Sequence, residues 1–273
     1  MRFTTYISFL LSSLCSRVSA MLISHKQRVG SYPSPALTDK HLELATLCRD
    51  VYCNGTESSD TYVKSNDTGA QATVRLKGKQ VVVCFRGSDS PQDWKLNLQL
   101  YRVPFISRTH KNPANEVHSG FFIGHHSIKA KIYTKLNAFI ASGECDSILF
   151  TGHSSGGALA AIAAFDFRND KHLPVEVVTF GSPKLGNASL AVEYSERITR
   201  CTRVVNDNDA IALMPLSRGF HHVGNTLHIQ DIAPTTNQGV WHALSNFVRL
   251  DSVFDHGIES YIRTIEAHID KQK

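Results

Sequence analysis

The stretch Ser147-Ile-Leu-Phe-Thr-Gly-His-Ser-Ser-Gly-Gly-Ala-Leu-Ala160 decides how this chain folds. Its apolar residues 148–150 predict a buried strand, and the alanine-rich residues that follow 157 predict a helix. Between them lies a GxSxG turn at 152–156. Glycine suits such a turn because neighbouring backbone approaches too closely for a Cβ atom. The stretch therefore predicts a strand, a sharp turn that exposes Ser154, and a helix.

A serine in this position is a candidate nucleophile. Its hydroxyl is too weak an acid to attack alone, so a histidine must accept the proton and a carboxylate must orient that histidine. The backbone amide of Ser155, at the start of the helix, is expected to bind an oxyanion with help from the helix dipole. The competing interpretation of the motif is an ordinary glycine-rich loop.

Patterns typical of strands and helices alternate along the chain. They predict a mainly parallel sheet that is covered by helices on both faces. The chain of 273 residues suits one domain, and residues 21–273 are predicted to form it. A polar segment, 54–69, is predicted to be a loop. The predicted helices are 38–52, 117–142 and 188–198, and the predicted strands are 72–76, 81–85, 148–150, 175–180 and 202–205.

The segment after the strand at 81–85 carries two further predictions. Ser88 lies in the loop that begins after that strand and is the candidate for the second oxyanion donor. Residues 91–101 mix apolar with charged side chains, which favours a short lid that opens at a lipid surface. The alternative is a surface helix whose apolar face belongs to the core. The predicted lid residues are Asp93, Trp94, Leu96 and Leu98.

The acid and the base are sought later in the chain. Ser154, Asp209 and His256 occur in the order serine, acid, histidine that is typical of hydrolases whose nucleophilic serine lies on a GxSxG turn. His256 is favoured among the fourteen histidines because it begins the last predicted helix. His153, beside the nucleophile, is expected to point away. Spacing alone leaves two rival acids, Asp207 and Asp255.

The first twenty residues resemble a signal peptide, with a basic start, an apolar core and the small residues 18–20 at its end. Secretion is therefore expected, and a membrane anchor or a cytosolic start are the alternatives. The sequons at Asn54, Asn66 and Asn187 are compatible with a secretory route and with a glycoprotein. No other segment reaches the roughly 20 apolar residues that span a bilayer.

Charge and cysteine content narrow the functional classes. The net charge of +5 comes from dispersed lysines and arginines, so nucleic-acid binding has little support, although anionic lipid remains a suitable partner. No cysteine or histidine spacing resembles a zinc site, so no metal or cofactor is expected. Of the six cysteines, Cys15 lies in the signal-like segment and five remain, an odd number unlike a disulfide scaffold. The sequence gives no sign of an obligate protein partner.

Several blocks together resemble the class 3 lipases, the fungal-lipase-like group of α/β hydrolases. The resemblance spans roughly residues 40–265, and blocks of this kind in this order are specific in combination. The blocks are Val82-Val-Cys-Phe-Arg-Gly-Ser88 with Asp93-Trp94, Val117-His-Ser-Gly-Phe121, Thr151-Gly-His-Ser-Ser-Gly-Gly157, Thr179-Phe-Gly-Ser-Pro-Lys-Leu-Gly-Asn187, Val204 through Asp209 to Pro215, His222-Val-Gly224 and Asp255-His256.

The resemblance implies an α/β-hydrolase fold and a role for each candidate. It implies Ser154 as nucleophile, Asp209 as acid and His256 as base, with Ser88 and the Ser155 amide as the oxyanion hole. The implied reaction is hydrolysis of carboxylic esters of acylglycerols or related lipids through an acyl-enzyme, without metal or cofactor. The alternatives are a phospholipase A1, an esterase for soluble or feruloyl-type cell-wall esters, and a catalytically silent binding homologue.

The chain also departs from the family pattern. Ser155 stands where the family usually has leucine, which keeps the backbone donor but changes the side chain. Ala210 and Ala212 stand where prolines are common in the acid loop. Cys53 follows a tyrosine as in secreted fungal members, but the chain has no C-terminal cysteine to pair with it.

Overall fold

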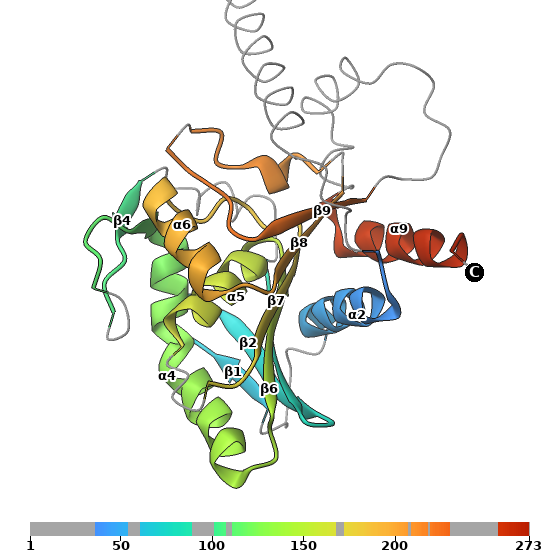
Figure 1. Ribbon diagram of the computed structural model, residues 1–273, viewed down its shortest axis with the longest axis horizontal. Helices are drawn as coiled ribbons and strands as arrows, with labels where there is room; N and C mark the ends of the chain where they lie inside the picture. Colours follow the sequence, from blue (N-terminus) through green and yellow to red (C-terminus); the bar gives the residue numbers. More distant parts are fainter. Residues whose placement is uncertain are drawn as a thin grey trace, which may run out of the picture.

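A seven-stranded sheet with the order β1-β2-β3-β6-β7-β8-β9 forms the centre of this computed structural model (Figure 1). The structure describes residues 36–53, 61–88, 101–107, 111–167, 172–206, 209–217, 219–229 and 256–272. The strands are β1 Tyr62–Lys64, β2 Gln71–Lys77, β3 Gln80–Phe85, β6 Ser147–His153, β7 Val175–Phe180, β8 Cys201–Asn206 and β9 Asn225–Ile229.

Neighbouring strands from β3 to β9 run parallel, whereas β1, β2 and β3 pair antiparallel. The predicted mainly parallel sheet is therefore confirmed. The prediction that 54–69 is entirely loop is wrong, because β1 lies within it and pairs with β2. A three-residue strand at the sheet edge gives too short a pattern to be seen in the sequence.

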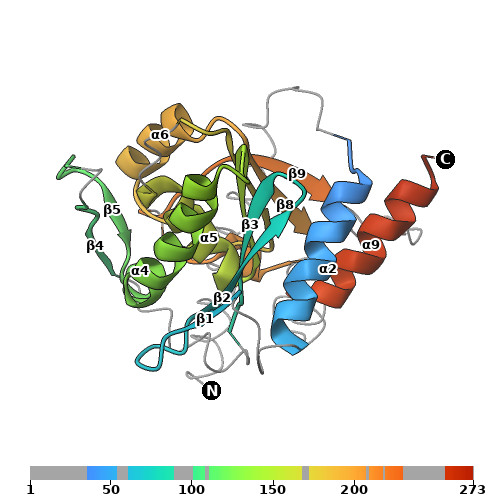
Figure 2. The same ribbon diagram turned by 90° about the horizontal axis from the view of Figure 1, so that it is seen from below.

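Helices cover both faces of the sheet (Figures 1 and 2). On one face lie α4 Ser119–Ser142 and α5 Ser155–Asp166, with α6 Ala188–Arg197 beyond them. On the other face α2 Asp39–Cys53 packs beside α9 Ile258–Asp270. The predicted helices near the N-terminus, before the turn and near 190 are thus confirmed.

Burial on both faces explains the continuous apolar run of β3. Side chains alternate between the two faces of a strand. Accordingly Val81, Val83 and Phe85 join the core cluster under α4 and α5. Val82 and Cys84 join the cluster under α2 and α9 instead. Residues that face either side of the sheet are therefore apolar in β3, as expected for a parallel strand whose two faces are both covered.

A small second sheet corrects one predicted boundary. Its strands are β4 Arg102–Pro104 and β5 Glu116–His118, which pair antiparallel. The predicted helix 117–142 therefore begins two residues later, at Ser119, and ends at Ser142 before Gly143 with a φ of 78°. Val117 pairs with β4 and also bridges to Gly186, so tertiary pairing overrides the helical pattern at this end.

The cysteines of the described residues form no disulfide. Within the described residues all five, Cys48, Cys53, Cys84, Cys145 and Cys201, are unpaired thiols. Cys48 and Cys84 are buried against each other, with 3.8 Å between their sulfur atoms. None of the described helices is long and apolar enough to cross a membrane.

The parallel strands bring the candidate site together. The carboxyl ends of parallel strands open on one edge of a sheet, where ligands of such folds usually bind. Phe85 at the end of β3 is paired with Gly152 of β6, and His153 of β6 with Phe180 of β7. Ser88, Ser154 and Asp209 follow β3, β6 and β8 respectively, so all three lie near this edge.

Candidate active site

The turn between β6 and α5 holds Ser154 in a strained conformation. Its φ of 58° and ψ of −132° lie outside the regions that residues with a Cβ atom prefer. A Cβ atom at Gly152 would collide with the carbonyl group of Gly156, and one at Gly156 would collide with the Phe85 carbonyl oxygen. The predicted strand, turn and helix are confirmed, and the two glycines are required by close backbone packing.

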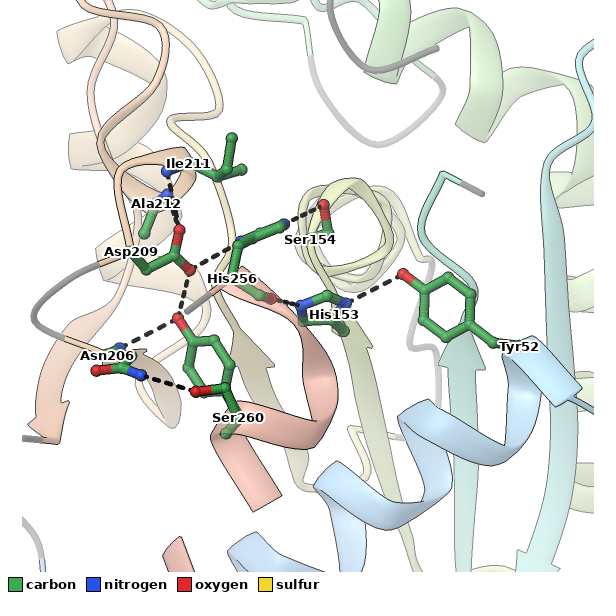
Figure 3. A network of polar contacts seen from close by, with 10 residues as sticks. Tyr52, His153, Ser154, Asn206, Asp209, Ile211, Ala212, His256 and Ser260 are labelled. Carbon is green, nitrogen blue, oxygen red and sulfur yellow. Dashed lines mark hydrogen bonds and ion pairs between the residues drawn. The ribbon is translucent and has the colours of Figure 1, made fainter. Parts of the chain in front are cut away.

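Ser154, His256 and Asp209 form a hydrogen-bonded line (Figure 3). The Nε2 atom of His256 lies 2.7 Å from Ser154 Oγ, and its Nδ1 atom lies 2.8 Å from Asp209 Oδ2. The side chain of Asp209 is fully buried, and that of His256 is 13% exposed. This is the geometry in which an imidazole can accept the serine proton while a carboxylate holds the other nitrogen protonated.

Asp209 is fixed as an ionised acceptor. Its Oδ1 atom accepts the backbone N–H groups of Ile211 at 2.8 Å and Ala212 at 3.1 Å. Burial opposes ionisation, but the electrostatic interaction with His256 and the hydrogen bonds that Asp209 accepts outweigh it, so the pKa of Asp209 lies below its ordinary value. The carboxylate therefore stays charged although it is buried.

Sequence patterns did not single out Tyr261, which also contacts the acid. Its hydroxyl donates to Asp209 Oδ2 at 2.6 Å and accepts the backbone N–H of Asn206 at 3.1 Å. Burial beside the negative carboxylate raises the pKa of Tyr261 well above its ordinary value, so the hydroxyl keeps its proton. The same oxygen of Asp209 thus accepts from both Tyr261 and His256, which restricts the carboxylate to one orientation.

His153 also supports the site, through contacts that the sequence did not predict. As expected it points away from Ser154, and its Nε2 atom lies 2.6 Å from the backbone carbonyl oxygen of His256. Its Nδ1 atom lies 3.0 Å from the hydroxyl of Tyr52 (Figure 3). A carbonyl oxygen only accepts, so Nε2 carries the proton and Nδ1 accepts from Tyr52. This pair ties α2 to the backbone of the candidate base.

Replacing Tyr52 by phenylalanine is expected to loosen this tie. The Nδ1 atom of His153 would be buried without a donor, which costs about 1–3 kcal/mol of unfolding free energy. The carbonyl of His256 would be held less firmly, and kcat for ester hydrolysis is expected to fall several-fold. Tyr133→Phe is the matched control, because that hydroxyl donates to the Ala163 carbonyl oxygen at 3.0 Å on the far part of α5.

Urea unfolding and initial-rate kinetics on both variants test this role. The Tyr133 variant is expected to lose stability while its kcat stays at the wild-type value. Equal kcat losses in the two variants would mean that Tyr52 acts only through overall stability.

Buried neutral histidines predict a loss of stability in acid. Burial lowers the pKa of His153 to about 3 and that of His118 to about 4, and it also lowers the pKa of His125. A histidine in the unfolded chain has a pKa of about 6.5, so below that pH it binds a proton, whereas the same buried histidine in the folded protein stays neutral. The free energy of unfolding should therefore be highest above pH 6.5 and fall toward pH 4, by up to about 1.4 kcal/mol per pH unit for each imidazole.

Two buried carboxylates add to this loss at its acid end. The pKa values of Asp166 and Asp209 lie below the ordinary value of 3.8, so the stability that they contribute is lost below about pH 5, and the slope between pH 7 and pH 5 reports the histidines. Urea unfolding at several pH values between 7 and 4 measures the slope. A free energy of unfolding that stays constant across this range would contradict the neutral state of the three histidines.

Ser88 and Ser155 meet beside the nucleophile. The backbone N–H of Ser88 donates to Ser155 Oγ at 3.0 Å, and the two hydroxyl oxygens are 3.1 Å apart. The backbone amide of Ser155 begins α5, where unpaired N–H groups and the helix dipole favour a negative charge. The structure thus brings both predicted oxyanion residues to the site of Ser154.

Some predicted features lie outside the described residues. These are the lid residues Asp93, Trp94, Leu96 and Leu98, the rival acids Asp207 and Asp255, the sequon at Asn54 and the signal-like segment 1–20. Among the residues that the structure does describe, no group of acidic, histidine or cysteine side chains is placed to hold a metal ion.

Solved lipase structures share this architecture. The Penicillium expansum triacylglycerol lipase superposes with a TM-score of 0.63 at 20% identity, over 71% of this chain and 78% of that one. The Rhizomucor miehei triacylglyceride lipase gives a TM-score of 0.61 at 23% identity, over 80% of this chain and 92% of that one. The fold is that of an α/β hydrolase, with a serine, histidine and aspartate in line at the carboxyl ends of its strands.

The family follows from the sequence comparison. The model of the family described as Lipase (class 3) matches residues 82–219, which is more than half of the 273-residue chain. The chain belongs to the class 3 lipase family. The matched segment contains Ser88, Ser154 and Asp209, whereas His256 lies beyond it and reaches the site through the fold.

Named relatives fall into two groups. "Phospholipase A1 EG1, chloroplastic/mitochondrial" from Oryza sativa subsp. indica is 30% identical in an alignment 218 residues long that covers 72% of this chain and 50% of the rice protein. "Secreted mono- and diacylglycerol lipase A" from Penicillium cyclopium is 28% identical in an alignment 183 residues long that covers 64% of this chain and 57% of the fungal protein. The alignments thus cover only about half of each relative's length.

Proposed function

We propose that this protein is a serine hydrolase that cleaves carboxylic esters of lipids, with acylglycerols as its substrate class. One observation carries the proposal: His256 Nε2 lies 2.7 Å from Ser154 Oγ while its Nδ1 lies 2.8 Å from the buried Asp209. Membership of the class 3 lipases and the name of the Penicillium relative support acylglycerols as substrates.

The reaction begins when Ser154 Oγ attacks the ester carbonyl carbon. The proton of Ser154 passes to Nε2 of His256, and Asp209 stabilises the resulting imidazolium. The carbonyl oxygen becomes an oxyanion, which is bound by the backbone amide of Ser155 and by Ser88. When the tetrahedral intermediate collapses, the ester bond breaks and His256 donates its proton to the leaving alcohol. Ser154 then carries the acyl group.

Water completes the cycle by the same route. His256 removes a proton from the water molecule, whose oxygen attacks the acyl carbon and forms a second oxyanion in the same hole. Collapse returns the proton to Ser154 and releases the fatty acid. Each step uses only groups of the chain and the two reactants, so no cofactor is required.

A phospholipase A1 is the second candidate. The rice relative, which bears that name, is 30% identical over 72% of this chain, and that observation favours a phospholipid substrate at the same site. Both candidates use the same chemistry at the acyl carbon and differ in the head group that the surrounding surface must accept.

Hydrolysis of an ester series tests the proposal. Glycerol esters and phosphatidylcholines with acyl chains from acetyl to oleoyl would be assayed below and above their solubility limits. Hydrolysis of long-chain acylglycerols supports the first candidate, and selective release of the fatty acid at the first glycerol carbon of phosphatidylcholine supports the second. Activity confined to soluble short esters would point to an esterase. If the folded protein cleaves none of them, the enzyme proposal fails in favour of a silent homologue.

We also propose that residues 21–273 form one catalytic domain and that 1–20 direct the chain into a secretory route. The name of the Penicillium relative includes "secreted", whereas that of the rice relative includes "chloroplastic/mitochondrial". Sequencing the N-terminus of the mature protein distinguishes the two, since cleavage after Ala20 supports secretion.

Of the sequons, Asn187 is already engaged, because its Nδ2 donates to the Ala114 carbonyl oxygen at 2.7 Å. Asn66 is the exposed one among the described residues.

A further inference from the structure

The backbone amide of Ser155 is the expected oxyanion donor, but the side chain of Ser155 makes contacts of its own. Its Oγ atom accepts the backbone N–H of Ser88 at 3.0 Å, and that amide is a donor which an oxyanion hole could have used. The same oxygen lies 3.1 Å from Ser88 Oγ, so the two serines share two contacts.

We propose that Ser155 is a positioning residue, whose hydroxyl aims the hydroxyl of Ser88 at the oxyanion. This inference rests on the proposed ester hydrolysis and extends it. The oxyanion would then be bound by the backbone N–H of Ser155 and the O–H of Ser88, while the amide of Ser88 serves to hold the two residues together.

The proton count is compatible with this assignment. A hydroxyl oxygen has one proton to donate and two lone pairs to accept. Because Ser155 Oγ accepts the Ser88 amide, its own proton can go to Ser88 Oγ, 3.1 Å away. The Ser88 proton is then left to point at a third group. Hydrogen bonds arranged in such a chain polarise one another, so Ser88 becomes a stronger donor than an isolated serine.

The backbone next to Ser88 packs closely against the turn that carries Ser154. A Cβ atom at Gly87, the residue before it, would lie 2.7 Å from the His153 carbonyl oxygen and 3.2 Å from Ser154 Cβ. The end of β3 also lies directly against the first turn of α5, since a Cβ atom at Gly156 would be 2.8 Å from the carbonyl carbon of Arg86. Ser88 is thus held within reach of the nucleophile by two segments that are themselves tightly packed.

A double-mutant cycle tests the assignment on a soluble short-chain ester, with kcat and KM measured separately. Ser88→Ala removes the donor and should lower kcat by about 100-fold. Ser155→Ala keeps the backbone amide and should lower kcat by about 10-fold with little change in KM, since it disorders the donor without removing it. Because Ser155 acts through Ser88, the double variant should be no slower than Ser88→Ala.

Ser155→Thr supplies the conservative rescue, because threonine keeps the hydroxyl oxygen and should restore most of kcat. Thermal unfolding of each variant checks that it is folded. The proposal is overturned if Ser155→Ala is as fast as the wild type or faster, or if the effects of the two alanine variants multiply. Failure of the wild type to cleave any ester would instead refute the proposed function. Loss of activity in Ser154→Ala shows that the measured rates come from the proposed active site, so that the effects of Ser155 and Ser88 can be interpreted.

Discussion

Ser154→Ala is expected to lower kcat for ester hydrolysis by about 10⁵- to 10⁶-fold, to the level that binding and the oxyanion hole supply without a nucleophile. The reason is chemical. The hydroxyl oxygen of Ser154 lies 2.7 Å from Nε2 of His256, so it is the group that this base is placed to deprotonate. Initial rates with a soluble ester and with an emulsified acylglycerol measure the effect.

Ser195→Ala is the matched control for this variant. Ser195 lies exposed on α6, and its hydroxyl donates to the Ala191 carbonyl oxygen at 2.9 Å. Its loss should leave kcat unchanged. A Ser154→Ala protein that is folded and retains a substantial part of the wild-type rate would rule out Ser154 as the nucleophile.

Asp209→Asn is expected to have the next largest effect, a fall in kcat of about 10⁴-fold at neutral pH. The amide has nearly the shape of the carboxylate, so the fold should survive. However, asparagine lacks the negative charge that stabilises the imidazolium of His256. It can also present an N–H to Nδ1, which would favour the wrong tautomer of the imidazole. The comparison of kcat with that of the wild type measures the loss.

The chain contains a second buried pair that serves as a control. The Nε2 atom of His125 lies 3.0 Å from Asp166 Oδ2, at the end of α5 opposite to Ser154. Asp166→Asn removes a buried charge with a pKa below its ordinary value, just as Asp209→Asn does. It should lower the free energy of unfolding and leave kcat near the wild-type value. If both variants lost kcat equally, Asp209 would have only a structural role.

Local patterns predicted the parts of the fold that repeat regularly. The strand, turn and helix around Ser154 follow from a short apolar run, two glycines and an alanine-rich segment, and the structure places them as expected. The resemblance to class 3 lipases assigned Asp209 and His256, which spacing alone had left open, and these are the two residues that line up with Ser154. Strands β1, β4, β5 and β9 were missed because each is short or irregular in sequence.

The groups that support the site could not be found from local patterns. Tyr52 and His153 are 101 positions apart in the chain, and His153 and the carbonyl of His256 are 103 apart. Only the packing of α2 and α9 on the same face of the sheet makes these contacts. Tyr261 lies on the inner face of α9, where its aromatic ring reads as an ordinary core residue. Such residues become visible when the partners of each buried polar atom are traced.

The most direct test of the central claim is covalent labelling by a fluorophosphonate, which reacts with serines that are activated by a neighbouring base. The labelled protein would be digested and the modified peptide sequenced by mass spectrometry. We expect the label on Ser154 in the wild type and its loss in a folded His256→Ala variant. Labelling of a different serine, or equal labelling of Ser154 without His256, would contradict the proposal that Ser154 is activated by His256 and Asp209.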